Sequence, residues 1–207
     1  METYDIYFAG SLFNIRELTG NVLLSKSIDE YSGGRYRCIL PQDLEQRKKT
    51  AKSIRDQDIK AVLEADFILA NYDGTELDSG TVVEFMVAKF ADIPAVLLRT
   101  DFRSGGDAKD GDPWNLMSSF YPRTIPLVIN GMSYYKDFGY DASNWNTSIG
   151  VIHAMEHLLQ EKPPITKDLG IQTSIYNWLN TTVGFEEPYT REELDAIIKR
   201  KREKGLL

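Results

Sequence analysis

Two kinds of apolar pattern alternate along the first half of the chain. Short continuous apolar runs are typical of buried strands, and the longer segments between them have apolar residues every three or four positions, as in amphipathic helices. Strands that alternate with helices predict a parallel sheet with right-handed crossovers. We therefore expect an α/β sandwich of flavodoxin-like or Rossmann-like type. The predicted strands are 4–9, 37–40, 67–71 and 95–99, and the predicted helices are 12–31, 50–65 and 80–91.

The second half of the chain has weaker patterns. A fifth strand at 126–130 and an amphipathic helix at 148–160 would complete a five-stranded, mainly parallel sheet. Residues 100–113 are rich in Gly and Asp and predict a long loop, either a lid or a solvated insertion. We expect one domain over 1–162, followed by a C-terminal helical extension over 163–207.

The C-terminal extension has its own signals. Thr190 and Glu193 have the spacing of a capping box and predict a short helix that ends in four basic residues, 199–202. The extension also carries several apolar side chains and is too apolar for a free linker. We therefore expect it to pack over the site or over a subunit interface. The apolar residues are Tyr176, Trp178, Leu179 and Phe185.

Composition narrows the classes of function. The chain has 207 residues, 42% of them hydrophobic, and a formal net charge of −7, which argues against attraction to nucleic-acid phosphates. The N-terminus has no signal-like segment, and no apolar run approaches the ~20 residues that cross a bilayer. We expect a cytoplasmic enzyme that acts on small molecules. The single cysteine, Cys38, lies in a predicted strand and is expected to be a buried thiol.

Glu84 is the first candidate for chemistry. It lies about one turn into the predicted helix 80–91, where most neighbouring residues are apolar, so we expect the helix to be largely enclosed. Enclosed carboxylates are rare unless they are paired or functional. The alternative is structural: Glu84 could complete a capping box with Thr81 or favour the positive end of the helix dipole.

Asp58 is a second candidate, on the helix predicted at 50–65. It borders the inward apolar stripe of this helix, whereas Asp56 and Glu64 are predicted to face solvent. Cleaving a bond to an anomeric carbon needs one carboxylate to meet the cationic transition state and another acid to protonate the departing group. A pair such as Asp58 and Glu84 would suit that chemistry.

The end of the first strand carries small residues around Gly10, which would allow a ligand to approach the backbone closely. The segment has no GxGxxG pattern, and no Walker sequence occurs in the chain, so dinucleotide and triphosphate binding are not indicated. Phe13 could stack on a base or belong to the core. The pattern HAMEH at 153–157 resembles a metal motif, but both histidines lie opposite the apolar stripe. We expect no metal and no organic cofactor.

Taken together, these residues resemble the nucleoside 2-deoxyribosyltransferase family over about residues 4–118, and the family has the flavodoxin-like fold. The resemblance depends on the joint order of four blocks. They are Tyr7-Phe-Ala-Gly-Ser-Leu-Phe13, Asp58 eight residues before Asp66, Asp78-Ser-Gly-Thr-x-x-Glu84, and Pro113-Trp-Asn-Leu-Met-Ser118.

The resemblance implies a role for each matching position. Glu84 falls at the family's nucleophile, and Tyr7 at a tyrosine that orients it. Asp58 matches the acid that handles the proton on the nucleobase, and Phe13 matches the aromatic residue that lines the base pocket. Asp78 falls where the family holds the 5′ hydroxyl of the sugar.

The family also implies a homo-oligomer, at least a dimer and by family habit a hexamer. Asn115 and Met117 match residues that reach the sugar from a neighbouring subunit. A glutamine that contacts the base is expected near residue 41, and Gln42, Glu45 and Gln46 remain open alternatives. Short bacterial members use their terminal carboxylate in the active site. Here about 40 residues follow position 160, so that contact must be absent, replaced by a side chain, or supplied by Leu207.

The implied reaction is transfer of 2-deoxyribose between nucleobases of 2′-deoxynucleosides through a covalent intermediate on Glu84. Two alternatives remain open: an N-glycosidase that hydrolyses 2′-deoxynucleoside 5′-monophosphates, and a non-catalytic nucleoside or nucleotide sensor. Asp78 favours nucleosides, because a carboxylate would repel a phosphate dianion and would accept a hydrogen bond from a free 5′ hydroxyl.

Overall fold

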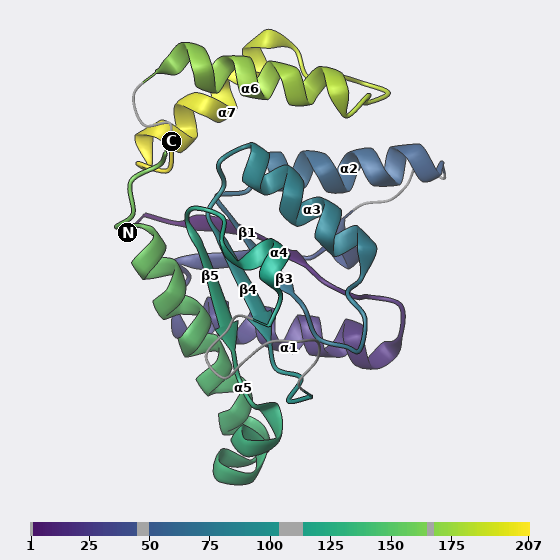
Figure 1. Cartoon of the computed structure of the whole chain (residues 1–207), viewed down its shortest axis with the longest axis vertical. Coiled ribbons are helices and arrows are strands. Elements are labelled where there is room, and N and C mark those ends of the chain that lie inside the picture. Colours follow the sequence, from purple (N-terminus) through teal and green to yellow (C-terminus); the bar gives the residue numbers. More distant parts are fainter. Residues whose placement is uncertain (1, 45–49, 104–113, 165–167) are drawn as a thin grey trace.

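Five parallel strands form a single sheet in the computed structural model, which describes residues 2–44, 50–103, 114–164 and 168–207 (Figure 1). The strand order is β2-β1-β3-β4-β5, and all neighbouring pairs are parallel. This order is that of flavodoxin-like folds, so the predicted α/β class is confirmed. The strands are β1 Tyr4–Ala9, β2 Tyr36–Ile39, β3 Phe67–Asn71, β4 Ala95–Arg99 and β5 Thr124–Val128.

Helices cover both faces of the sheet, with α1 and α5 on one face and α2 and α3 on the other (Figure 1). Several begin at side-chain caps that the sequence supplies, such as Asn14 before α1 and Thr50 before α2. The helices are α1 Ile15–Tyr31, α2 Ala51–Glu64, α3 Ser79–Phe90, α4 Leu116–Ser119, α5 Gly131–Leu158, α6 Leu169–Thr182 and α7 Arg191–Glu203, with a short 3-10 helix, η1, at Pro41–Asp43.

Helix α5 is much longer than the predicted helix 148–160. It begins at Gly131 and bends at Gly139, whose φ of 73° and ψ of −175° are not helical. A glycine with this backbone interrupts the helical repeat of apolar positions, which explains why the first part of the helix was missed. Strand β5 also begins earlier than predicted, at Thr124 rather than Pro126.

Alternate residues of the central strands enter two separate cores. On β1, Tyr7 packs on the side of α2 and α3, whereas Ile6 and Phe8 pack on the side of α1 and α5. Because both faces are covered, the central strands are apolar along their whole length, as parallel strands usually are. Each of these fully buried large side chains contributes about 1.5–3 kcal/mol to folding. The sheet is therefore a rigid base for residues at its carboxyl end.

Helices α6 and α7 form an outer pair beyond α2 and α3 (Figure 1). Tyr176 and Leu179 are buried in the core on that side of the sheet. The Asp56 carboxylate accepts a hydrogen bond from the backbone N–H of Glu186 at 2.7 Å, and Asp56 is only 7% exposed. The prediction that Asp56 faces solvent is therefore wrong, because the C-terminal extension covers the outer face of α2. Glu64 is exposed, as predicted.

The last residues lie at the amino ends of the strands. Arg123, just before β5, donates a hydrogen bond to the carbonyl oxygen of Leu206 at 2.9 Å. Lys204 donates to the Asp66 carboxylate at 2.6 Å, just before β3. Leu207 is buried nearby, at the end of the sheet opposite to the carboxyl ends of the strands. Within one chain, Leu207 therefore lies away from the Tyr7–Glu84 contact.

Within the described ranges, the helices are all too short or too polar to cross a bilayer. Cys38 lies on β2 and is half-buried, and its surroundings raise the pKa of the thiol to about 12 through burial. A thiol with so high a pKa is inert near neutral pH.

Candidate active site

The centre of the candidate site is a contact between β1 and α3. The Tyr7 hydroxyl donates a hydrogen bond to Oε1 of Glu84 at 2.7 Å. Tyr7 is fully buried, because β1 is the sheet's second strand and this residue points toward α2 and α3. The cap of α3 is Asp78, whose carboxylate accepts from the backbone N–H and the hydroxyl of Thr81 at 2.7 and 2.8 Å. Glu84 therefore does not form a capping box with Thr81, and that structural alternative is wrong.

The surroundings of Glu84 raise the pKa of its carboxyl group well above the ordinary value. Burial raises its pKa to about 7, the hydrogen bond from Tyr7 lowers it, and the negative charges of Asp58 and Asp78 raise it. Burial, with further contributions from Glu84 and Asp58, also raises the pKa of the Tyr7 hydroxyl far above its ordinary value. Tyr7 therefore remains a hydrogen-bond donor throughout the physiological range.

Asp58 lies on α2 and belongs to the same electrostatic cluster, since its charge acts on both Glu84 and Tyr7. Burial raises its pKa to about 6. Its Oδ1 atom is buried and has no hydrogen-bond partner among the described residues. A buried acceptor without a partner usually marks a functional position or the place of a missing ligand. Among the described residues, no cation contributes to the pKa shift of either carboxyl.

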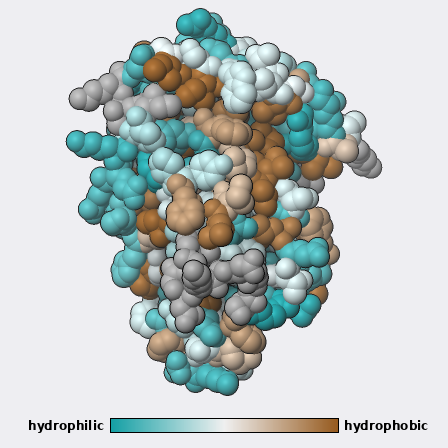
Figure 2. Space-filling view, viewed as in Figure 1, coloured by the Kyte–Doolittle hydropathy of each residue, from teal (hydrophilic) through white to brown (hydrophobic). Residues whose placement is uncertain are grey.

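The surface beside Glu84 is more apolar and more open than the sequence predicts. Val83 is 56% exposed and Phe90 48% exposed, so α3 is not enclosed as expected. Figure 2 shows brown surface near the middle of this face, where Figure 1 has α3 and α4. We call the exposed apolar residues of α3 and α4, with the residue that follows α4, the α3–α4 strip. They are Val83, Phe90, Leu116, Met117 and Phe120.

The segment between β1 and α1 holds two of the expected substrate-binding residues. Phe13 is 77% exposed, so its side chain is outside the core and available to a ligand. Gly10 is buried, and a Cβ atom there would lie 3.2 Å from Cβ of Asn71. Glycine thus allows the ends of β1 and β3 to approach closely.

The other two expected substrate contacts lie at the start of α4. Asn115 caps α4, because its Oδ1 accepts from the backbone N–H of Ser118 at 3.0 Å, and Met117 is 85% exposed. No hydrogen bond in the described part of the chain joins either residue to Glu84.

The expected base-contacting glutamine is not settled by the structure. The Gln42 side chain donates to the carbonyl oxygen of Leu18 at 3.1 Å and accepts from Asn21 at 3.4 Å, so it is held against α1. Glu45 and Gln46 lie outside the described residues, as does most of the predicted loop at 100–113.

Arg99, at the end of β4, is a residue that the sequence did not single out. Its buried guanidinium donates to the carbonyl oxygens of Tyr72 and Gly74 at 2.5 and 3.1 Å and stacks on Trp114, 3.6 Å from the ring centroid. It thereby joins the loop that leads to Asp78 to the segment that leads to α4. The one available signal was an arginine at the end of an apolar strand.

The HAMEH pattern does not form a metal site in the described residues, which contain no group of three or more potential metal ligands. His153 and His157 are exposed on α5, as predicted, and Val151, Met155 and Leu158 are buried on the opposite side.

Comparison with known proteins finds one matching family model. The model of the family described as nucleoside 2-deoxyribosyltransferase matches residues 6–117, which is more than half of the chain. The match includes Tyr7, Asp58, Asp78, Glu84 and Met117. No curated protein sequence matches the chain significantly.

Several solved structures are similar to the chain, each with a TM-score below 0.5. A conserved protein of Enterococcus faecalis V583 is 25% identical, with 75% of this chain and 95% of that chain covered and a TM-score of 0.46. A 2-deoxyribosyltransferase of Leishmania mexicana is 21% identical, with coverage of 66% and 99% and a TM-score of 0.47. The CMP N-glycosidase of Clostridium botulinum is 11% identical, with coverage of 72% and 98% and a TM-score of 0.46.

Proposed function

Because the chain belongs to the nucleoside 2-deoxyribosyltransferase family, we propose that it transfers 2-deoxyribose between the nucleobases of 2′-deoxynucleosides. The observation that carries the proposal is the hydrogen bond of 2.7 Å from Tyr7 to Glu84. A second carboxyl group, Asp58, acts on the same pair electrostatically and has no cationic partner among the described residues. This is the arrangement that displacement at an anomeric carbon requires.

The proposed reaction is a double displacement. Ionised Glu84 attacks C1′ of the bound nucleoside, and the bond from C1′ to the base nitrogen breaks. The departing base takes a proton from Asp58, which leaves a deoxyribosyl ester on Glu84 and an ionised Asp58. An incoming base then attacks C1′, returns its proton to Asp58 and releases Glu84. The sugar lacks the electron-withdrawing 2′ hydroxyl, so its cationic transition state is easier to reach.

Substrate binding should favour the protonation states that the reaction needs. Burial raises the pKa of both carboxyl groups in the free protein. A base bound over Asp58 would remove its remaining water and raise its pKa further. Positive charge that develops at C1′ would in turn favour ionised Glu84. A bound nucleoside would thus favour a protonated Asp58 and an ionised Glu84.

Asp78 supports a nucleoside rather than a nucleotide as substrate. Its charge is close enough to raise the pKa of Glu84, so it lies near the reacting carboxylate. A phosphate dianion beside Asp78 would be repelled, whereas a free 5′ hydroxyl could donate a hydrogen bond to the carboxylate. We place the reaction in the cytoplasm, in the salvage of free deoxynucleosides and bases.

The α3–α4 strip supports assembly into a homo-oligomer. Exposed apolar patches of this kind mark interaction surfaces, and Val83 within the strip is the neighbour of Glu84. A second copy packed on the strip would bring Asn115 and Met117 to the partner's open site. We therefore propose a dimer-based assembly, up to a hexamer, in which each site is completed by a neighbouring chain.

One incubation tests the reaction against its two alternatives. The protein is mixed with deoxyinosine and free adenine, and the products are separated by chromatography. We expect deoxyadenosine and hypoxanthine in equal amounts. Release of free deoxyribose without deoxyadenosine would indicate a hydrolase, in which case deoxynucleoside 5′-monophosphates should be tried as substrates. Binding without any product would indicate a sensor and would overturn the proposal.

A further inference from the structure

A cavity lies on the face of the sheet opposite to Glu84. Its volume is about 560 Å³, within the range of about 300–1,000 Å³ typical of small-molecule sites. Its walls come from α1 and from the two limbs of α5 on either side of Gly139, and its floor comes from the ends of β1, β3 and β4. Phe8 and Tyr7 are consecutive residues on β1, and Phe8 lines this cavity while Tyr7 reaches Glu84.

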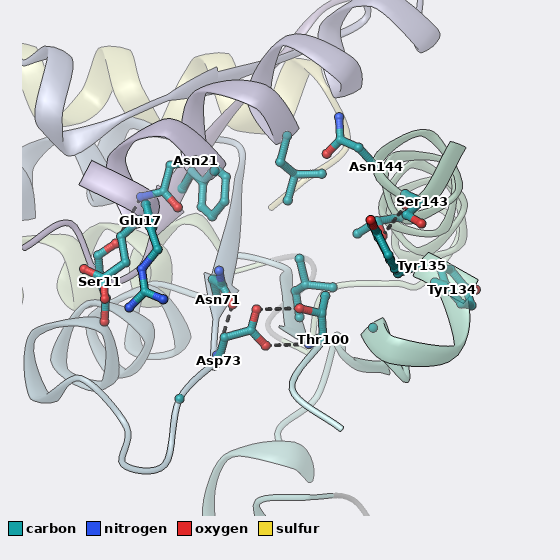
Figure 3. Close-up of a pocket in the computed structure, with 18 of the residues that line it drawn as sticks. Ser11, Glu17, Asn21, Asn71, Asp73, Thr100, Tyr134, Tyr135, Ser143 and Asn144 are labelled. Carbon is teal, nitrogen blue, oxygen red and sulfur yellow. Dashed lines mark hydrogen bonds between the residues drawn. The ribbon is translucent and has the colours of Figure 1, made fainter. Parts of the chain in front are cut away.

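Side chains of complementary kinds face each other across the cavity. In Figure 3, Asn21 and Glu17 project from the side of α1, and Asn144 and Tyr135 project from the side of α5. Asn71 lies between them, at the end of β3. The cavity thus combines carboxamide groups, which both donate and accept hydrogen bonds, with aromatic rings from α5. The aromatic lining residues from α5 are Tyr134, Tyr135 and Tyr140.

The charges around the cavity do not favour an anion. Arg16 is the cation in the lining, and two carboxylates, Glu17 and Asp73, oppose it. Asp73 is already engaged, since it accepts from the backbone N–H and the hydroxyl of Thr100 at 2.5 and 2.6 Å. Glu17 likewise accepts from the backbone N–H of Phe13 at 2.8 Å. A phosphorylated ligand would find no excess of positive charge here.

We propose that this cavity is a second binding site, for a neutral planar heteroaromatic molecule with amide-like edges, that is, a free nucleobase or its nucleoside. Aromatic side chains stack on the flat face of any nucleobase, and carboxamides match ring edges that carry both donors and acceptors. The described hydrogen bonds use Nδ2 of Asn21 and Asn144 and Oδ1 of Asn71, which leaves Oδ1 of Asn21 and Asn144 and Nδ2 of Asn71 for the ligand. A purely apolar ligand would leave these three groups without compensation for the water they lose.

The second site shares a wall with the proposed active site. Ser11 and Asn14 line the cavity, and they flank Phe13, the exposed aromatic residue assigned to the base pocket. A ligand in the cavity would therefore contact the segment that carries Phe13. The binding itself does not depend on chemistry at Glu84, so the two proposals can fail separately.

Gly20 on α1 allows a direct test. It lines the cavity, and a Cβ atom built there meets nothing within 4 Å, so Gly20→Trp can fill the space while Gly20→Ala leaves it open. Equilibrium dialysis of the full-length chain against labelled adenine should give about two sites per chain for wild type and Gly20→Ala, and one for Gly20→Trp. Tyr135 lies on the opposite wall of the cavity, and Tyr135→Ala should weaken adenine binding at the cavity site by about tenfold.

The outcomes are distinct. Equal adenine stoichiometry in all four proteins, with the melting temperature of each variant showing that it is folded, would overturn the second site. Gly20-dependent binding of 2-deoxyribose or AMP in preference to adenine would overturn the proposed ligand class. An active exchange enzyme with a single adenine site would remove only this inference. A protein without exchange that keeps the Gly20-dependent site would remove only the proposed reaction.

Discussion

Buried carboxylates have different partners at the two ends of the sheet. At the amino end, Asp66 is 1% exposed and receives the Lys204 ammonium at 2.6 Å, and Asp92 is 8% exposed with the Arg123 guanidinium at 3.4 Å. Buried charges of this kind are tolerated because each has an opposite charge and hydrogen bonds. At the amino end, buried ion pairs thus attach other parts of the chain to the sheet.

At the carboxyl end, Glu84 and Asp58 have no cationic partner among the residues that the structure describes. Burial raises the pKa of both, and within the same residues the one hydrogen bond to either carboxyl group is that from Tyr7 to Glu84. Buried acids without a cation are typical of active sites. The comparison teaches that a cationic partner, rather than burial, distinguishes the carboxylates of the amino end from those of the candidate site.

The largest effect should come from Glu84→Gln. We expect base exchange to fall by about 10⁴-fold or more, because the nucleophile is lost. The free energy of unfolding should instead increase at alkaline pH. The raised pKa of Glu84 means that its favourable contribution is complete below about pH 4.5 and is lost as the pH rises through about 7. A neutral Gln avoids this loss, so the variant should be more stable at pH 8 by about 1–3 kcal/mol.

Chromatographic exchange assays and thermal melts at pH 5 and pH 8 measure both effects. Exchange at the wild-type rate in folded Glu84→Gln would remove this residue as nucleophile.

The next effect concerns the acid at the same end. Asp58→Asn should lower the exchange rate by about 10²–10⁴-fold, because the leaving base receives no proton. A 2-deoxyriboside with a better leaving group needs less protonation and should lose less activity, which steady-state kinetics with both donors would show. An equal loss with both donors would argue for a positioning role of Asp58 instead.

At the amino end, Arg123→Met should affect stability and not the reaction. It removes the Arg123 guanidinium from Asp92 and from the Leu206 carbonyl, which should cost about 3–5 kcal/mol in the free energy of unfolding. The matched control is Arg191→Met, whose pair with Asp195 at 3.7 Å is exposed and is worth about 0–1 kcal/mol. Denaturant titration measures both. A fall in kcat in folded Arg123→Met would break the separation between the two ends.

The smallest effect should come from Tyr7→Phe. Removing one hydrogen bond to a charged group costs about 1.5–3 kcal/mol, which is about 10- to 100-fold in rate. That hydrogen bond also lowers the pKa of Glu84, so without it the pKa rises further above about 7. The acid limb of the pH–rate profile, where Glu84 becomes protonated, should therefore move to higher pH. An unmoved limb would mean that Glu84 does not control it.

The sequence predicts the α/β framework well because each central strand is covered on both faces. The run at β3 and the helix after it are placed to within a residue, since apolar continuity and a capping Asp78 are local signals. The first limb of α5 was missed because Gly139 breaks the helical repeat locally. Asp56 was misplaced for the opposite reason: local periodicity is regular there, but distant residues from the extension cover it.

The candidate site also has some features that local sequence predicts and others that depend on the tertiary fold. Glu84 stood out from the sequence because an acid in an apolar helix is a local anomaly. Its contact with Tyr7, 77 positions away, depends on the parallel packing of β1 with β3 and on the placement of α3 over them. Arg99 and the cavity between α1 and α5 gave no local anomaly, because both depend on elements brought together only by the fold.

The unreactive thiol of Cys38 has a practical consequence for surface attachment. Since the chain holds one cysteine and burial keeps its pKa near 12, a cysteine introduced at Lys199 would be the thiol that reacts with maleimide at neutral pH. The Lys199 side chain is 77% exposed on α7, on the opposite side of α2 and α3 from the sheet. A chain tethered there would leave the carboxyl ends of its strands, and with them the candidate site, facing the solution.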